Sequence, residues 1–303
     1  TAQLLTASPT AVIKSVKAVS ISGVGSSRPS SPSRSSRARY SGRTGAHFEF
    51  IGKCKKHLER FPVWETIFNI DYHNIQENAV DPEYYDSGEL TTGYAEMELY
   101  NRPNPFLTYY FRSAVKKGIV NSQFLRVNLQ TNIYYKFTKK LKAKLRIWAG
   151  GFLYADKLPQ QYRTYLSGNI DPDFRKNYIF NRTPDLNDAS IGTRQYDIGG
   201  PSLHGLILDE NGKMLGVDSW VISANYEMNI PKIPGKPFMD AAIIPGEEPY
   251  FDFGLKKSFG PLSIIMPLYQ SWDETPFVTD TDWVLDRLRF SLTLSGFNVR
   301  SIF

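Results

Sequence analysis

The residue types that usually carry catalysis form no recognisable constellation in this sequence. It contains no H-E-x-x-H zinc motif, no G-x-S-x-G nucleophile turn and no G-x-x-x-x-G-K phosphate-binding loop. Glu96 and Glu98 share one face of a predicted strand, which suits either proton transfer or, as we favour, the lining of a wet lumen. Cys54 and His57 offer only two metal ligands, fewer than a zinc site needs. The sequence therefore predicts no catalytic residue, no metal site and no cofactor.

The composition favours strands and gives no reason to expect nucleic-acid binding. Aromatic residues make up 14% of the 303 residues, and aromatic side chains are enriched in strands. The net charge is +6, but much of it comes from residues before position 61, so no nucleic-acid partner is predicted. The lone cysteine, Cys54, excludes an internal disulfide framework.

The apolar runs are too short for a membrane helix, which needs roughly 18 consecutive apolar residues. A membrane β-strand hides half of its side chains from lipid, so the mean hydropathy of −0.35 is compatible with a membrane barrel. The chain begins at Thr1 without a clear secretory signal, which favours a mature product or a fragment of a longer protein.

Residues 1–61 differ from the rest of the chain and are predicted to be disordered or irregular. Ser26–Arg43 is a Ser/Arg/Pro/Gly tract with almost nothing to bury, and Lys53–Arg60 is a short basic segment. Residues 62–303 show strand periodicity instead, and we expect them to form the folded domain.

The clearest periodic segment is a predicted hairpin over Phe124–Tyr154. In its first strand, apolar and polar residues alternate over 13 positions, as expected when successive side chains point to opposite faces. The turn at Thr138–Lys140 separates it from a second alternating strand, Leu141–Leu153. Thirteen residues at ~3.3 Å each span roughly 43 Å, which at a tilt of ~40° still crosses an apolar band of ~25 Å. The face predicted to contact lipid contains Leu125, Val127, Leu129, Ile133, Tyr135 and Phe137.

Weaker alternation recurs along the chain and predicts about ten to twelve strands. No amphipathic helix of useful length separates them, so the fold class is predicted to be all-β, an antiparallel transmembrane β-barrel. One connection, residues 155–202, is long and poorly periodic, whereas others are short. Membrane barrels have this asymmetry, with short turns on one side and long loops on the other. A hairpin is also expected around Asn211-Gly212.

The C-terminal half resembles the barrel of the bacterial surface-antigen family, the BamA-like barrels. The residues that carry the resemblance are Tyr250–Leu255, Phe259–Leu262 and Met266–Leu268, preceded by Phe238–Ala242. Their order is similar to the closing strands of that family. The resemblance implies an outer-membrane barrel of a Gram-negative bacterium with more strands than are visible here, so part of the barrel is expected to be missing. It also implies membrane lipid and the barrel-assembly machinery as partners.

The same resemblance implies a loop tip inside the barrel lumen. The family has an Arg-Gly-aromatic tip, and the matching positions here are Leu203, His204, Gly205 and Leu206, with His204 in place of the arginine and Leu206 in place of the aromatic residue. More narrowly, Arg146–Tyr154 and Tyr162–Gly168 resemble barrels fused behind aminopeptidase-N-like metallopeptidase domains. The zinc motif is absent from this chain, so no catalytic role transfers.

Three functions remain open from the sequence. The leading expectation is an integral outer-membrane barrel that serves as a membrane anchor or belongs to the assembly and secretion class. The second is a soluble all-β binding module, a sandwich or a lipocalin-like barrel, whose apolar faces would point inward. The third is the barrel portion of a larger membrane-anchored metallopeptidase.

Overall fold

The computed structural model describes residues 42–53, 63–75, 86–167, 196, 199–209, 214–260 and 262–292. The described part of the protein is all-β, as the periodicity predicts, and eleven strands form one sheet in the order β1-β2-β3-β4-β5-β6-β9-β10-β11-β12-β13. Every neighbouring pair is antiparallel. The strands are β1 (Gly42–Lys53), β2 (Val63–Ile75), β3 (Gly88–Asn104), β4 (Leu107–Val120), β5 (Gln123–Lys136), β6 (Lys142–Lys157), β9 (Val221–Asn229), β10 (Lys236–Ile243), β11 (Tyr250–Phe259), β12 (Leu262–Gln270) and β13 (Arg289–Leu292).

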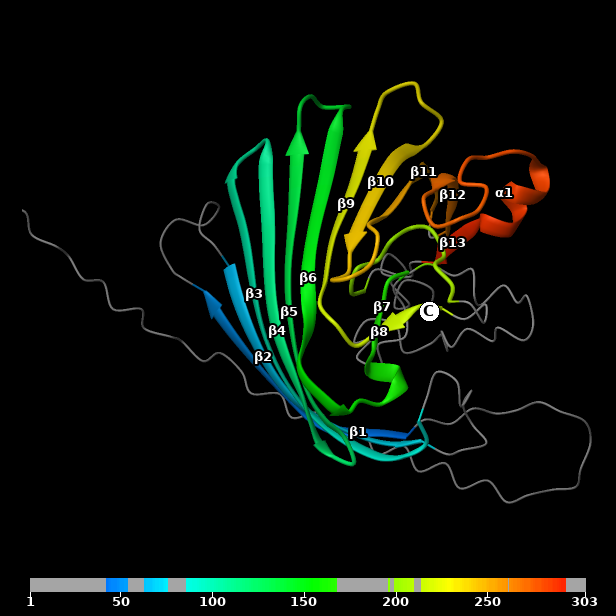
Figure 1. The fold of residues 1–303 in the computed structure, drawn as a ribbon. Helices are drawn as coiled ribbons and strands as arrows, with labels where there is room; N and C mark the ends of the chain where they lie inside the picture. The colour runs from blue at the N-terminus through cyan, green and yellow to red at the C-terminus, as the bar shows by residue number, and fades with distance from the viewer. Residues whose placement is uncertain are drawn as a thin grey trace, which may run out of the picture.

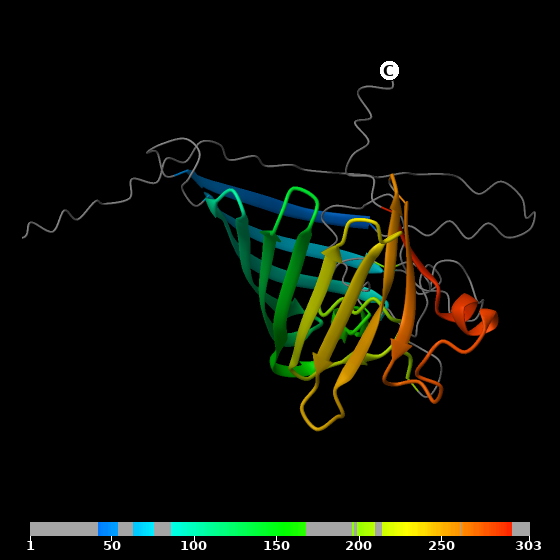
Figure 2. The same cartoon turned by 90° about the horizontal axis from the view of Figure 1, so that it is seen from above.

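The sheet curves strongly, and the described parts of the long connection between β6 and β9 lie on its concave side (Figures 1 and 2). The barrel closure that the sequence predicts is not found, because within the described residues β1 and β13 are the two ends of an open sheet. The number of strands in the sheet falls within the range expected from the periodicity.

The predicted central hairpin is confirmed. β5 and β6 hold 14 and 16 residues and pair from Lys136 opposite Lys142 to Gln123 opposite Lys157. The turn between them is closed by Thr138, whose hydroxyl accepts a hydrogen bond from the Leu141 amide at 2.9 Å. Such a side-chain bond takes the place of a backbone partner in a short turn.

Two boundaries differ from those expected. The first strand, β1, lies inside the 1–61 segment that was expected to be disordered or irregular, so the sheet begins earlier than residue 62. The long connection is also displaced, because β6 continues to Lys157 and β9 begins only at Val221. Composition obscured β1, since the Ser/Arg/Pro/Gly tract runs directly into it. Asn211 and Gly212 lie outside the described residues, although Leu208 and Met214 on either side form an antiparallel bridge.

The connection from β6 to β9 has local structure of its own. It contains the 3-10 helix η2 (Gln160–Tyr162) and a two-stranded ribbon of β7 (Thr164–Tyr165) and β8 (Gly216–Val217). Its apolar residues pack against Trp148 of β6 and Ala242 of β10 on the concave side of the sheet. The cluster formed in this way contains Trp148, Leu166, Leu203, Ile207, Val217, Val221, Ala242 and Ile244.

The connection between β12 and β13 contains the helix α1 (Thr281–Arg287). Asp280 caps it by accepting a hydrogen bond from the Trp283 amide at 2.8 Å, as acidic residues commonly do before the first turn. At the other end Arg287 forms an ion pair of 2.6 Å with Asp273. These contacts hold the connection beside the end of the sheet that leads into β13 (Figure 1).

Candidate functional site

Polar side chains are buried on the concave face of the sheet, and apolar side chains are exposed on the convex face. In β5, Arg126 and Asn132 are 3% and 7% exposed, whereas Leu129 is 45% exposed. The same inversion occurs in the neighbouring strands. The buried polar residues include Thr92, Glu96, Lys116, Arg146, Ser223, Asn225, Asp240, Asp252, Gln270 and Arg289, and the exposed apolar residues include Ile70, Met97, Val115, Ile147, Ile222, Met239, Ile243, Phe251 and Phe253.

The residues predicted to contact lipid all lie on this convex face. Leu129, Tyr135 and Phe137 are exposed, and Phe137 lies just beyond the end of β5. The remaining three, Leu125, Val127 and Ile133, are partly exposed. An ordinary water-soluble sheet would bury this face and expose the other.

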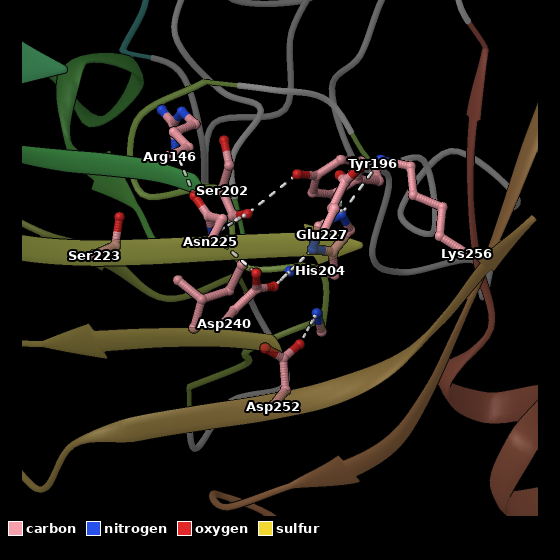
Figure 3. Close-up of polar contacts among 12 residues, drawn as sticks. Arg146, Tyr196, Ser202, His204, Ser223, Asn225, Glu227, Asp240, Asp252 and Lys256 are labelled. Carbon is pink, nitrogen blue, oxygen red and sulfur yellow. Dashed lines mark hydrogen bonds and ion pairs between the residues drawn. The ribbon is translucent and has the colours of Figure 1, made fainter. Parts of the chain in front are cut away.

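The predicted loop tip lies on the concave side, where it is buried. Leu203 and His204 are 0% and 1% exposed, Gly205 is buried and Leu206 is partly buried. The His204 backbone amide donates to the Asp240 carboxylate of β10 at 2.6 Å, and its ring Nδ1 lies 2.7 Å from the same oxygen. The Gly205 amide donates to the Asp252 carboxylate of β11 (Figure 3). Two strand carboxylates therefore hold two successive residues of the tip.

Aromatic rings enclose the His204 imidazole on both sides. Tyr196 stacks on it at 4.5 Å and Phe238 at 4.3 Å between ring centroids. The second ring nitrogen, Nε2, faces the Glu227 carboxylate at 3.3 Å and the Lys256 ammonium at 3.4 Å. Burial, with the Asp240 carboxylate nearby, raises the pKa of the Tyr196 phenol, which therefore stays neutral and donates to the Ser202 carbonyl.

Two buried arginines bind the carbonyl groups of the same loop. Arg289 of β13 donates to the carbonyls of Leu203, His204 and Gly205 at 3.2, 3.0 and 3.1 Å. Arg146 of β6 donates to the carbonyls of Pro201, at 3.0 Å, and Gly200. A guanidinium group has five donors in a fixed plane, so one side chain can satisfy several carbonyls of an irregular segment. The tip is thus bound through both its amides and its carbonyls.

Gly205 allows this close approach. A Cβ atom at this position would lie 2.4 Å from Gln270 Nε2, 2.6 Å from Trp272 Cζ2 and 2.8 Å from Asp252 Oδ2. These contacts are too short for any side chain, so the backbone reaches the sheet only because the residue is glycine. The role of this glycine is steric.

The carboxylate pair considered for acid–base chemistry is engaged in a local network. Arg112 of β4 binds Glu96 and lies 3.8 Å from Glu98, and the hydroxyls of Tyr94 and Tyr110 donate to these carboxylates. Both carboxylates are thus engaged by one shared cation and by two phenols. This arrangement favours the lining of the concave face over proton transfer.

Sequence reasoning identified the tip and missed the strand residues that hold it. Asp240 and Asp252 are single acidic residues between apolar neighbours, and Arg146 and Arg289 have the parity of the polar face. A single charged residue among apolar neighbours in a strand was the signal that the sequence offered. It does not reveal which residue the charge binds. His47 and His73 lie in β1 and β2, and Cys54 and His57 lie outside the described residues.

No group of three or more His, Cys, Asp or Glu side chains that could hold a metal ion is found in the described part of the chain. Among the same residues, no helix is long and apolar enough to cross a membrane. No protein-family model matches the sequence, and no curated protein sequence matches it.

Proposed function

We propose that this chain forms the lipid-contacting wall of an outer-membrane β-barrel in a Gram-negative bacterium. The observation that carries the proposal is the inverted distribution of side chains, polar and buried on the concave face and apolar and exposed on the convex face. Lipid is the environment that stabilises an apolar outer surface and leaves the polar groups to pair inside.

The extent of the apolar face supports lipid as its covering. Exposed apolar side chains occur on every strand of the eleven-stranded sheet from β2 to β11, for example Ile70, Met97, Val115, Leu129 and Ile147 on the first five of them. Water-soluble monomers rarely expose a continuous apolar patch of more than a few hundred Å². A soluble sandwich or lipocalin-like module would place these side chains inside, which is opposite to their position here.

The lengths of the strands also fit a membrane. β3 to β6 contain 17, 14, 14 and 16 residues. A strand of 14 residues spans roughly 46 Å, and a tilt of ~40° leaves roughly 35 Å of height, enough for an apolar band of ~25 Å. Strands in soluble proteins are usually only ~5–6 residues long.

Within this proposal, the chain acts as a membrane anchor or as a barrel of the assembly and secretion class, similar to the BamA-like barrels. The loop tip on the concave side supports that class, since the sequence resemblance implies a tip inside the lumen. Its proposed partners are outer-membrane lipid and the barrel-assembly machinery. We propose no catalytic step for this chain, because its buried carboxylates serve as partners for the loop and for Arg112.

The proposal is tested with spin labels at two adjacent residues of β5. In a Cys54→Ser background, Leu129→Cys places a label on the convex face and Gln130→Cys places one on the concave face. In liposomes, we expect the Leu129 label to be relaxed by oxygen, which concentrates in lipid, and the Gln130 label by a water-soluble nickel chelate. A label at Lys139, in the β5–β6 turn, serves as the water-exposed control.

The proposal fails if both β5 labels respond to the nickel chelate as Lys139 does. It also fails if the folded chain is monodisperse in buffer without detergent, because the convex face would then have to be covered by something other than lipid.

A further inference from the structure

The short-turn end of the sheet carries a marked excess of positive charge. Residues 136–144, 227–236 and 255–260 hold five, two and two lysines, nine in total, and a single carboxylate, Glu227. Two of the connections at the opposite end are acidic instead. Residues 244–250 contain Glu247 and Glu248, and residues 273–286 contain five acidic residues and no lysine or arginine. Among these connections, the lysines are therefore concentrated at the short-turn end.

Four of these lysines form a row across the concave face. Lys136 of β5 lies opposite Lys142 of β6, and Lys236 of β10 lies opposite Lys256 of β11. Asn229 of β9, opposite Lys142, lies between the two pairs. The row points inward, because it has the parity of the buried residues Asn132, Arg146, Asn225, Asp240 and Asp252 on the same five strands. With adjacent strands ~4.8 Å apart, the five strands span roughly 19 Å.

Little negative charge is available to this row from the protein itself. Lys256 forms an ion pair of 2.9 Å with Glu227, whereas Lys136, Lys142 and Lys236 form no ion pair with any described residue. Like charges directly opposite each other on a sheet destabilise it. The two lysine pairs therefore oppose folding slightly unless an anion lies against them.

A small cavity lies beside the row. It holds about 10 Å³ and is lined by Glu227, which pairs with Lys256 of the row, and by Arg146, Tyr196 and His204. Figure 3 shows these side chains around the loop tip. This volume holds about one water molecule, so an extended ligand would lie along the row and not in this cavity.

We propose that this row of lysines, the cationic mouth, binds an extended acidic polypeptide segment. Neutral hydrogen-bonding groups lie among the lysines. Asn229 lies in the row, and Tyr134 lies two residues before Lys136 on the same face of β5. A peptide presents amide groups between its carboxylates and matches this alternation, whereas polyphosphate carries charge without interruption. All four cations are lysines, which bind anions as point charges, and none is an arginine with its planar fork for phosphate.

The test measures binding of a fluorescein-labelled deca-glutamate peptide to the full chain, kept in whichever of buffer or detergent leaves it monodisperse. We expect Lys136→Gln/Lys142→Gln/Lys236→Gln to weaken binding at least tenfold and to flatten its dependence on salt. The matched control is Lys139→Gln/Lys140→Gln/Lys232→Gln, which removes the same charge from the turns of the same end. We expect the control to weaken binding less than threefold.

Three outcomes would overturn the proposal. The first is no binding of the peptide by the unmodified chain at low salt. The second is an equal loss of affinity in the two triple variants, which would indicate diffuse attraction by the whole end. The third is a higher affinity for polyphosphate than for the peptide, measured by displacement at equal concentrations of charge. This outcome would identify a phosphate-binding site. The result does not depend on the membrane proposal, since the two triple variants are compared under the same solvent conditions.

Discussion

The two faces of the sheet show how one strand can satisfy two opposite environments. On the concave face many polar groups have defined partners, as in the contacts of Asp240 with the His204 amide at 2.6 Å and with Asn225 Nδ2 at 3.1 Å. On the convex face the side chains are apolar and exposed, with Leu129 at 45% and Ile222 at 56%. The concave face is stabilised by particular pairings, and the convex face needs only an apolar surrounding. Substitutions on the two faces should therefore fail for different reasons.

The largest effect is expected from removal of Asp240 on the concave face. Asp240→Ala leaves the His204 amide and ring nitrogen and the Asn225 amide without their buried acceptor. Removing one member of such a buried network typically costs about 3–5 kcal/mol. We expect the midpoint of denaturant-induced unfolding to fall accordingly and the segment around residue 204 to become sensitive to protease.

Ser258→Ala is the control for this variant, because Ser258 is exposed and bonds only to Ser263 among the described side chains. Equal protease resistance in Asp240→Ala and the unmodified chain would show that the arginine contacts hold the loop without the carboxylate.

An intermediate effect is expected for charge introduced on the convex face, and it should depend on depth. Leu129 lies in the middle of β5, whereas Phe137 lies beyond its end, and both are exposed, at 45% and 52%. Arginine at the midplane of a membrane barrel costs about 2–4 kcal/mol and near the boundary about 0–1 kcal/mol. In liposomes, Leu129→Arg should therefore lower the free energy of unfolding much more than Phe137→Arg.

The pair also separates the two environments that could surround the convex face. In water both residues are exposed surface positions, so both arginine variants would be tolerated alike. Equal unfolding free energies for the two variants in liposomes would therefore contradict a lipid-covered convex face.

The alternation of residue types predicted the strands well where one face differs clearly from the other. β5 and β6 were predicted from their sequence pattern, because apolar and polar residues alternate there over a long run. β1 was not found, since it follows a low-complexity tract that masks its pattern. The sheet order of a meander also follows from short turns. The curvature of the sheet and its two unpaired edges do not follow from the turns, because they depend on the geometry of all the strands together.

The residues that hold the loop could not be paired from the sequence. Asp240 and Asp252 are far along the chain from the tip, and a period of two reveals the face of a strand but not its partner on another element. Residues 203–206 were singled out in the sequence only through a resemblance to a known family, and their role as a lumen tip stays a prediction. The steric requirement for Gly205 became clear only from the atoms of Gln270 and Trp272 that surround it.

The smallest effects should appear in conservative apolar substitutions, and here the two faces should differ in sensitivity to shape. Ile222 is exposed on the convex face and Ala242 is fully buried in the concave cluster. Ile222→Leu keeps an apolar surface of equal volume and should change the free energy of unfolding by less than about 0.5 kcal/mol. Ala242→Leu inserts a larger side chain into the cluster that also contains Trp148 and Leu203, and should cost about 1–3 kcal/mol, as overpacking usually does.

Both variants are compared by denaturant unfolding under the same lipid conditions. A cost for Ile222→Leu as large as that for Ala242→Leu would mean that the convex face is also packed against a defined surface, such as a protein partner. In the proposed lipid environment, the acyl tails would adjust to either side chain at position 222, whereas the concave cluster has fixed neighbours. The two substitutions measure this difference.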